Sequence, residues 1–277
     1  MQRTTEHNFA RYNTATVLLL DVRGLSKRYR KFDALSDLSF SVSSGEIVGL
    51  LGPNGAGKTT SLRCIAGIIR PTGGSIFVNG SDLLAGGEAE REAKRRVAFV
   101  PEQPNPYELL TVWEHLKFVA LAYETTEGFD ERAGDLLVRF DLAAKRDSLV
   151  GTLSKGMRQK LTIACAFVRH ATVFLFDEPL IGLDPRGARE LREQLVAARE
   201  AGAAILVSTH MLDTAQTLCD RIVILRQGRM VAEGTLDALR ERAQATGFAS
   251  LEEVFFTLTA EHGDVGVLPE ASAEARE

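Results

Sequence analysis

Apolar runs rich in Val, Ile, Leu and Phe alternate along the chain with longer stretches in which apolar residues recur at helical spacing. Four runs are short, continuously apolar and followed by a loop, as expected for strands that helices cover on both faces. These runs are Glu46–Leu51, Arg96–Val100, Val173–Asp177 and Ala203–Ser208. Strands that alternate with helices are typical of α/β proteins, so the pattern predicts an α/β fold with a largely parallel central sheet.

Short turns between other apolar runs predict antiparallel strands beside this sheet. The turns are Ser-Ser-Gly between Leu38–Val42 and Glu46, Asn79-Gly80 after Ser75–Val78, and Gln227-Gly228 within Ile222–Val231. Turns of this length and composition favour hairpins. We therefore expect a mixed sheet with an antiparallel β edge near residues 16–80.

The middle of the chain has a different pattern. Residues 107–170 show little strand signal and several helical periods, including Thr111–Ala122 and Phe129–Phe140, which predicts a helical subdomain at about 105–170 inserted into the sheet. The folded domain is expected to span residues 18–260. Residues 1–17 form a polar tail, and residues 261–277 form an acidic, Ala-rich tail that we expect to be flexible.

Charge and composition exclude several classes of protein. The 277 residues include 33 Lys and Arg and 37 Asp and Glu, which gives a net charge of -4. This charge argues against sequence-independent binding of nucleic acid. No apolar run approaches the roughly 20 residues of a transmembrane helix, and the polar N-terminus lacks an apolar signal core. The cysteines and histidines are scattered without the spacing of a zinc site or a disulfide framework. We expect a cytoplasmic protein without a nucleic-acid partner.

Residues 52–59 read Gly-Pro-Asn-Gly-Ala-Gly-Lys-Thr and fit the phosphate-binding pattern GxxxxGKT, between a predicted strand and a predicted helix. The glycines let several N–H groups and a helix N-terminus point at one anion. Lys58 adds a charge near the β and γ phosphates, and Thr59 offers its hydroxyl to Mg²⁺. A Gly-rich turn without a ligand is the alternative. The predicted phosphate-binding residues are Gly52, Pro53, Asn54, Gly55, Ala56, Gly57, Lys58, Thr59 and Thr60.

Two acids, Asp177 and Glu178, end the apolar strand Val173–Asp177. Carboxylates at the C-terminal end of a parallel strand lie where ligands bind in such sheets. Asp177 would hold Mg²⁺ through water, and Glu178 would orient or deprotonate the water that attacks a phosphoryl group. The alternative is that the acids cap the following helix.

A third motif, Leu-Ser-Lys-Gly-Met-Arg-Gln-Lys at residues 153–160, lies between these two. Together the motifs resemble the nucleotide-binding ATPase of an ABC transporter over roughly residues 18–260, which implies a P-loop NTPase core. The start of the third motif is similar to the family signature LSGGQ, with Lys155 and Met157 at two of its positions. The resemblance implies a head-to-tail dimer of identical or paralogous chains, in which Ser154 and Gly156 of one subunit close over ATP held by the other.

Further residues match the family in the expected order. Tyr29 resembles the aromatic residue that stacks on adenine, and His210 resembles the switch histidine that contacts the γ-phosphate. Residues 180–185 are similar to the D-loop, with Ile181 where the family usually has serine. Glu102 stands where many relatives have a metal-contacting glutamine and Gln103 follows it, so either residue could serve; we take Gln103 as the metal ligand.

The resemblance implies an ATPase with Lys58, Glu178 and His210 as catalytic residues and with ATP and Mg²⁺ bound. Residues 107–116 resemble the surface that receives a membrane partner, and the form LSKGM with residues 251–256 resembles exporters. The leading hypothesis is therefore a subunit that energises export through a separate transmembrane permease, peripheral on the inner face of the cell membrane. The alternatives are a soluble ABC-type ATPase of translation or DNA repair and, with less support, a P-loop kinase or GTPase.

Overall fold

The computed structural model describes residues 17–245, 247 and 249–260, so the tails predicted at 1–17 and 261–277 lie outside the described residues, apart from residue 17. The strands are β1 (Leu18–Tyr29), β2 (Phe32–Ser43), β3 (Glu46–Leu51), β4 (Gly73–Val78), β5 (Ser81–Asp82), β6 (Val97–Val100), β7 (Val173–Asp177), β8 (Ala204–Thr209), β9 (Arg221–Arg226) and β10 (Arg229–Gly234). The helices are α1 (Lys58–Ile65), α2 (Gly87–Arg95), α3 (Val112–Ala122), α4 (Phe129–Arg139), α5 (Lys155–Phe167), α6 (Pro185–Glu200), α7 (Leu212–Leu218), α8 (Leu236–Arg242) and α9 (Leu251–Ala260).

The strands form two sheets. A central sheet has the order β10-β9-β3-β8-β7-β6, in which only β10 runs antiparallel to its neighbour. An antiparallel sheet has the order β2-β1-β4-β5. This arrangement confirms the predicted mixed α/β fold, and all four strands predicted as buried lie in the central sheet within one residue of their expected ends.

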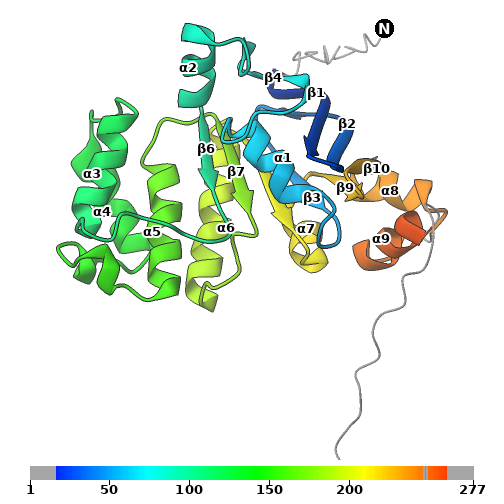
Figure 1. Cartoon of the computed structure of the whole chain (residues 1–277). Helices are drawn as coiled ribbons and strands as arrows, with labels where there is room; N and C mark the ends of the chain where they lie inside the picture. The colour runs from blue at the N-terminus through cyan, green and yellow to red at the C-terminus, as the bar shows by residue number, and fades with distance from the viewer. Residues whose placement is uncertain (1–16, 246, 248, 261–277) are drawn as a thin grey trace, which may run out of the picture.

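The central sheet is buried on both faces because its side chains alternate between two hydrophobic clusters. Val48, Leu50 and Leu175 point toward the antiparallel sheet and α1. Ile47 and Phe176 point the other way, toward helices α3 to α6. A third cluster packs α7, α8 and α9 against β9 and β10. Figure 1 shows α3, α4 and α5 together at one end of the molecule and α8 and α9 at the other.

One predicted hairpin is wrong. β2 and β3 belong to different sheets, because both edges of β3 are already paired with β8 and β9. The connecting turn is instead held to the start of β8: Ser44 Oγ donates to the Gly202 carbonyl at 2.8 Å, and Gly45 N–H donates to the Ala203 carbonyl at 3.1 Å. The chain therefore crosses from one sheet to the other at this turn.

The other two predicted hairpins are confirmed. Asn79 and Gly80 join β4 to β5 with φ angles of 49° and 79°, and Gln227 and Gly228 join β9 to β10 with φ angles of 50° and 76°. Two successive residues with positive φ match the right-handed twist of the strands they connect.

Residues 105–170 carry α3, α4 and α5, which contact one another. Thr111 begins α3 with a capping box: its hydroxyl accepts from Glu114 N–H, and the Glu114 carboxylate accepts from Thr111 N–H. This reciprocal pair satisfies two helix-end donors and fixes the start of the helix that the sequence predicts. In the described part of the chain, no helix combines the length and apolar character needed to cross a bilayer.

Candidate functional site

The loop between β3 and α1 is shaped by its glycines. Gly57 precedes α1 with φ 107°, and a Cβ atom there would lie 2.9 Å from the Ala34 carbonyl oxygen. A side chain is excluded at this position by both backbone strain and close approach. No side chain caps the N-terminus of α1, so its first N–H groups face the space above the loop. Such a helix end attracts an anion.

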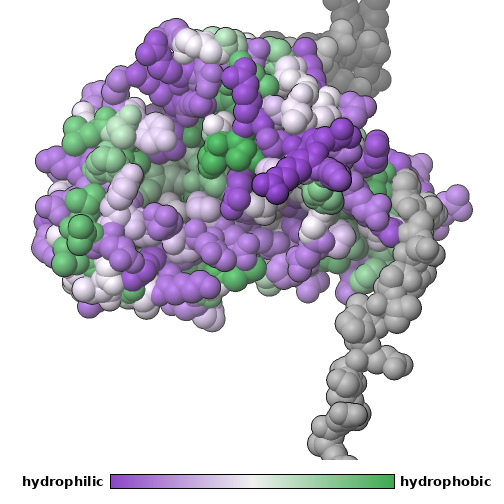
Figure 2. Space-filling model, in the orientation of Figure 1, coloured by the Kyte–Doolittle hydropathy of each residue, from purple (hydrophilic) through white to green (hydrophobic). Residues whose placement is uncertain are grey.

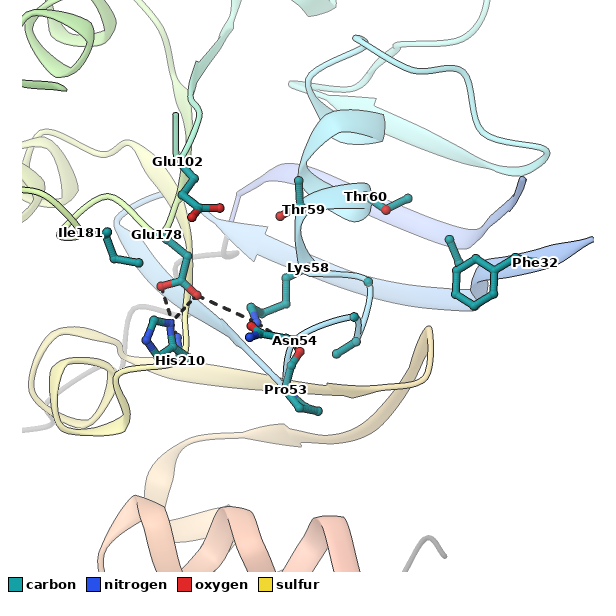
Figure 3. Close-up of a pocket in the computed structure, with 14 residues that line it drawn as sticks. Phe32, Pro53, Asn54, Lys58, Thr59, Thr60, Glu102, Glu178, Ile181 and His210 are labelled. Carbon is teal, nitrogen blue, oxygen red and sulfur yellow. Dashed lines mark hydrogen bonds and ion pairs between the residues drawn. The ribbon is translucent and has the colours of Figure 1, made fainter. Parts of the chain in front are cut away.

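A cavity of about 360 Å³ opens above this loop (Figure 3). Every predicted phosphate-binding residue except Gly52 lines it. The remaining walls come from four other segments and consist of Phe32, Ala34, Glu102, Glu178, Ile181 and His210. The cavity therefore combines the loop with the ends of β7 and β8 and with a loop after β6.

Lys58 is buried at the base of the cavity and is held by its own loop. Its Nζ donates to the carbonyl oxygens of Gly52 at 2.7 Å and Pro53 at 3.3 Å, and lies 3.9 Å from Glu178 Oε1. Burial lowers the pKa of Lys58, while the nearby carboxylates of Glu178, Asp177 and Glu102 oppose that shift. An ammonium group is thus positioned where the first turn of α1 begins.

Glu178 follows the last residue of β7 in a left-handed backbone conformation, with φ 47°. This conformation is costly for a residue with a side chain and occurs often at functional sites. The backbone N–H of Glu178 donates to the Ser208 carbonyl at 3.1 Å, and its Oε1 lies 2.9 Å from His210 Nδ1. Lys58, Glu178 and His210, predicted from three separate motifs, therefore meet at one point of the cavity (Figure 3).

Asp177 lies one residue earlier and is buried. Its Oδ1 accepts a hydrogen bond from Ser208 Oγ at 2.6 Å, and it does not line the cavity. Ser208 in β8 thus fixes both acids, through the Asp177 side chain and the Glu178 backbone. The sequence pattern gave no reason to single out Ser208, because its hydroxyl acts across the β7–β8 pair.

Tyr29 and Gln103, which the sequence predicts to bind ligand, do not line the cavity, but a neighbour of each does. Phe32 lines it, whereas Tyr29 does not; the two are cross-strand partners at the end of the β1–β2 hairpin. Glu102 lines it, whereas Gln103 does not. The turn between Tyr29 and Phe32, Arg30-Lys31, has none of the Gly or Asn residues that mark a hairpin in sequence.

Ser154 and Gly156 lie at the N-terminus of α5 and do not line the cavity. Ser154 caps the helix, because its Oγ accepts from Met157 N–H at 3.3 Å. A Cβ atom on Gly156 would lie 3.0 Å from the Gly182 carbonyl oxygen, so the turn sits against the segment that contains Ile181. The structure thus contains a second helix N-terminus, outside the cavity of its own chain.

Curated proteins resemble this chain over nearly its whole length. The ABC-type transporter ATP-binding protein EcsA of Bacillus subtilis is 38% identical, with 88% of this chain and 97% of that protein aligned. The SkfA peptide export ATP-binding protein SkfE of the same organism is 37% identical, with 82% and 93% aligned. A Nod factor export ATP-binding protein I of Burkholderia orbicola is 38% identical, with 82% and 74% aligned.

Solved structures and a family model agree with these relatives. An ATP binding subunit of an ABC transporter superposes with a TM-score of 0.83 at 42% identity, covering 87% of this chain and 99% of that one. A dimeric ATP-binding cassette in a post-hydrolysis state, bound to ADP and Pi, gives a TM-score of 0.71 at 25% identity, covering 78% and 98%. The ABC transporter family model matches residues 35–181. The chain therefore belongs to the ABC transporter family, as one of its ATP-binding ATPases.

Proposed function

We propose that the cavity holds ATP with Mg²⁺, that a second subunit completes the site, and that hydrolysis drives export through a separate transmembrane permease. The observation that carries this proposal is the meeting of Lys58, Glu178 and His210 at the phosphate-binding loop. Phosphoryl transfer to water needs a positive charge that binds phosphate and a carboxylate that orients the attacking water. Lys58 and Glu178 provide these groups, and His210 lies beside the carboxylate.

The cavity suits a nucleoside triphosphate. N–H groups of the loop and the uncapped end of α1 would face the phosphates, and the Lys58 ammonium group would exchange the carbonyl oxygens of Gly52 and Pro53 for phosphate oxygens. Phe32, which is largely exposed at the rim, offers a flat apolar face for the base. We therefore assign stacking on adenine to Phe32 together with, or in place of, the family-implied Tyr29.

The oxygen donors near the loop suit Mg²⁺, a hard cation that takes hydroxyl, carboxylate and water ligands. Thr59 and Glu102 line the cavity, and Asp177 lies behind Glu178 at the end of β7. Across the described residues, no group of three or more His, Cys, Asp or Glu could hold a metal by itself, which fits an ion that also needs phosphate oxygens. The bound ion would neutralise charge on those oxygens. We propose Glu102 rather than Gln103 as the residue of the loop after β6 that contacts this ion.

Glu178 is proposed to orient the attacking water and accept its proton. The oxygen of that water forms a bond to the γ-phosphorus while the bond to the bridging oxygen breaks, giving ADP and phosphate. His210 holds the carboxylate through Nδ1 at 2.9 Å, so its position is fixed before nucleotide binds. Lys58 would stabilise negative charge on the phosphate oxygens during this step.

The second subunit follows from the placement of the signature turn. Ser154 and Gly156 lie at a helix N-terminus that does not line the cavity of their own chain. A second copy or a paralogous chain, arranged head to tail, would bring this turn over the nucleotide. A related cassette that is dimeric with ADP and Pi bound supports the presence of a second subunit.

Export through a membrane partner is supported by the relatives. SkfE and the Nod factor protein are named as export ATP-binding proteins, and another structural neighbour, cbiO1 of Clostridium perfringens, is part of the transporter complex cbiONQ, with a TM-score of 0.68 at 25% identity. We therefore place the chain on the inner face of the cell membrane, bound to a permease. Transport is favoured over a role in translation or DNA repair by these relatives.

The experiment that tests this function uses a variant that binds ATP but hydrolyses it slowly. The Glu178→Gln protein should form a dimer when ATP and Mg²⁺ are added, measured by analytical ultracentrifugation, and should remain monomeric with ADP. The same protein carrying Lys58→Ala as well is the control and should not dimerise. A Glu178→Gln protein that stays monomeric at saturating ATP would contradict the proposed shared site.

A further inference from the structure

The loop between β6 and α3 presents two strongly exposed apolar side chains. Leu109 is 88% exposed and Tyr107 is 61% exposed, and they flank Glu108. The Tyr107 ring packs edge-to-face on Phe118 of α3, with ring centroids 5.2 Å apart. Figure 2 shows hydrophobic surface around α3 and α4, at this end of the molecule. Exposed apolar side chains therefore lie both on this loop and on α3, where Phe118 is 44% exposed.

This loop is joined by its backbone to the segment that leads into α5. Gly151 N–H donates to the Glu108 carbonyl at 3.0 Å, and Val150 N–H donates to the Leu110 carbonyl at 2.9 Å. A Cβ atom on Gly151 would lie 3.2 Å from the Glu108 carbonyl oxygen. The two backbones are therefore in close contact, three residues before Ser154.

Arg158 adds a side-chain link between the same two segments. From the second turn of α5, its Nη1 donates to Glu108 Oε1 at 3.0 Å and its Nη2 donates to the Gly151 carbonyl at 2.8 Å. The Arg158 backbone N–H also donates to the Ser154 carbonyl at 2.9 Å. One guanidinium group thus joins the exposed loop to the turn that carries Ser154.

The opposite side of α5 is fixed separately. Lys160 is buried and pairs with Asp184 at 2.9 Å, and Asp184 caps α6 by accepting from Gly187 N–H at 3.1 Å. Residues two apart on a helix project about 200° from each other. Lys160 therefore holds α5 to the segment after Glu178, while Arg158 holds it to the exposed loop.

We propose that Arg158 is a positioning residue: through Glu108 it makes the placement of the Ser154 turn depend on the loop Tyr107–Leu110. This inference rests on the proposed function, in which Ser154 acts on nucleotide held by a second subunit. Glu108 is mostly exposed, whereas Arg158 is only partly exposed. Because water screens an ion pair with one partner at the surface, we expect the Arg158–Glu108 pair to matter more for the placement of the Ser154 turn than for the free energy of unfolding.

The test compares ATP-dependent dimerisation among variants of the full chain that all carry Glu178→Gln. Arg158→Gln and Glu108→Gln should each raise the ATP concentration for half-maximal dimerisation about tenfold, and the double variant should be no worse than either single one, because coupled residues are not additive. The matched control is Arg189→Gln, which removes an exposed arginine paired with Glu193 on α6 and should leave dimerisation unchanged.

Two further measurements separate placement from folding. The melting temperature, and the ATP affinity at protein concentrations below those of dimerisation, should be the same in Arg158→Gln and Arg189→Gln. A fall in either quantity for Arg158→Gln would overturn the inference in favour of a structural role. Dimerisation of Arg158→Gln that matches the control, or effects of Glu108→Gln and Arg158→Gln that add, would also overturn it. A parent Glu178→Gln protein that does not dimerise would instead overturn the proposed function and, with it, this inference.

Discussion

Two helix N-termini in this chain, those of α1 and α5, are built differently although both could bind phosphate. The end of α1 is preceded by Gly57, has no side-chain cap and lies in a cavity whose other walls come from the same chain. The end of α5 is capped by Ser154, next to the exposed Lys155, and is not part of that cavity. The N-terminus of α1 thus forms part of a site within its own chain, whereas the N-terminus of α5 is available to bind another molecule.

Nucleotide binding is expected to be a property of one chain, whereas hydrolysis is expected to need a pair of chains. Lys58 and His210 each lie beside Glu178 in the single chain, so binding of nucleotide should need no partner. Ser154 lies outside the cavity, so its effect should appear only when two chains meet. Substitutions at the two helix ends should therefore separate binding from hydrolysis.

The largest effect is expected for Glu178→Gln. Loss of the carboxylate removes the proposed base, so the rate of ATP hydrolysis should fall by about 10² to 10⁴, the usual scale for general base catalysis. ATP affinity of the monomer should be retained. Phosphate release under saturating ATP measures the rate, and hydrolysis near that of the unaltered protein would exclude the role of base.

Lys58→Ala should weaken ATP binding about 100-fold or more, because a buried charge that contacts phosphate is lost. Titration with a fluorescent ATP analogue measures this affinity. Ser154→Ala is the comparison and should bind the analogue like the unaltered chain. If the two variants lost affinity equally, the assignment of binding to a single chain would fail.

Ser154→Ala should slow hydrolysis about 10- to 100-fold, the loss expected for one hydrogen bond to a charged group. Mixing Ser154→Ala protein with Lys58→Ala protein should restore part of the activity, since one of the two sites in a mixed dimer has an intact loop and an intact signature turn. Activity of the mixture equal to the average of the separate proteins would show that the sites are not shared.

Phe32→Ala should weaken ATP binding about fivefold, by loss of roughly 1 kcal/mol of stacking on the base. Tyr29→Ala should have a smaller effect, because Tyr29 does not line the cavity. Binding of inorganic triphosphate, which has no base, should be the same in both variants and serves as the control. A larger loss for Tyr29→Ala would return adenine stacking to the residue that the family pattern indicates.

The smallest effect is expected in the loop after β6, which contains Glu102 and Gln103. Glu102→Ala should raise the Mg²⁺ concentration for half-maximal hydrolysis about threefold, as expected for one ligand among several on a cation that keeps most of its waters. Gln103→Ala should leave it unchanged, because Gln103 does not line the cavity. The reverse order would assign the metal contact to Gln103.

Much of the fold could be predicted from local patterns, and the exceptions have physical causes. Buried strands such as β7 are continuous apolar runs, so their positions follow from sequence. The partner of β3 does not follow, because the Ser-Ser-Gly turn is compatible with a hairpin and only competition from β8 and β9 excludes it. The β1–β2 turn was missed because Arg30 adopts φ 51° without being Gly or Asn.

The candidate site was predictable where motifs are contiguous in sequence. The loop at 52–59 and the acids after β7 are such cases, and the structure places Lys58 beside Glu178. Which of two neighbouring residues faces the cavity was not predictable, as Glu102 and Phe32 illustrate, because this depends on how a strand or loop is rotated. The role of Ser208 depends on strand pairing and has no local signal.

The contacts that Lys58 makes within its own loop bear on how the protein behaves between rounds of catalysis. After product leaves, the ammonium group can return to the carbonyl oxygens of Gly52 and Pro53, so the emptied loop keeps its curvature instead of relaxing to a disordered segment. We expect the next nucleotide to meet a preformed receptor and to associate at a rate set by diffusion and displacement of one side chain.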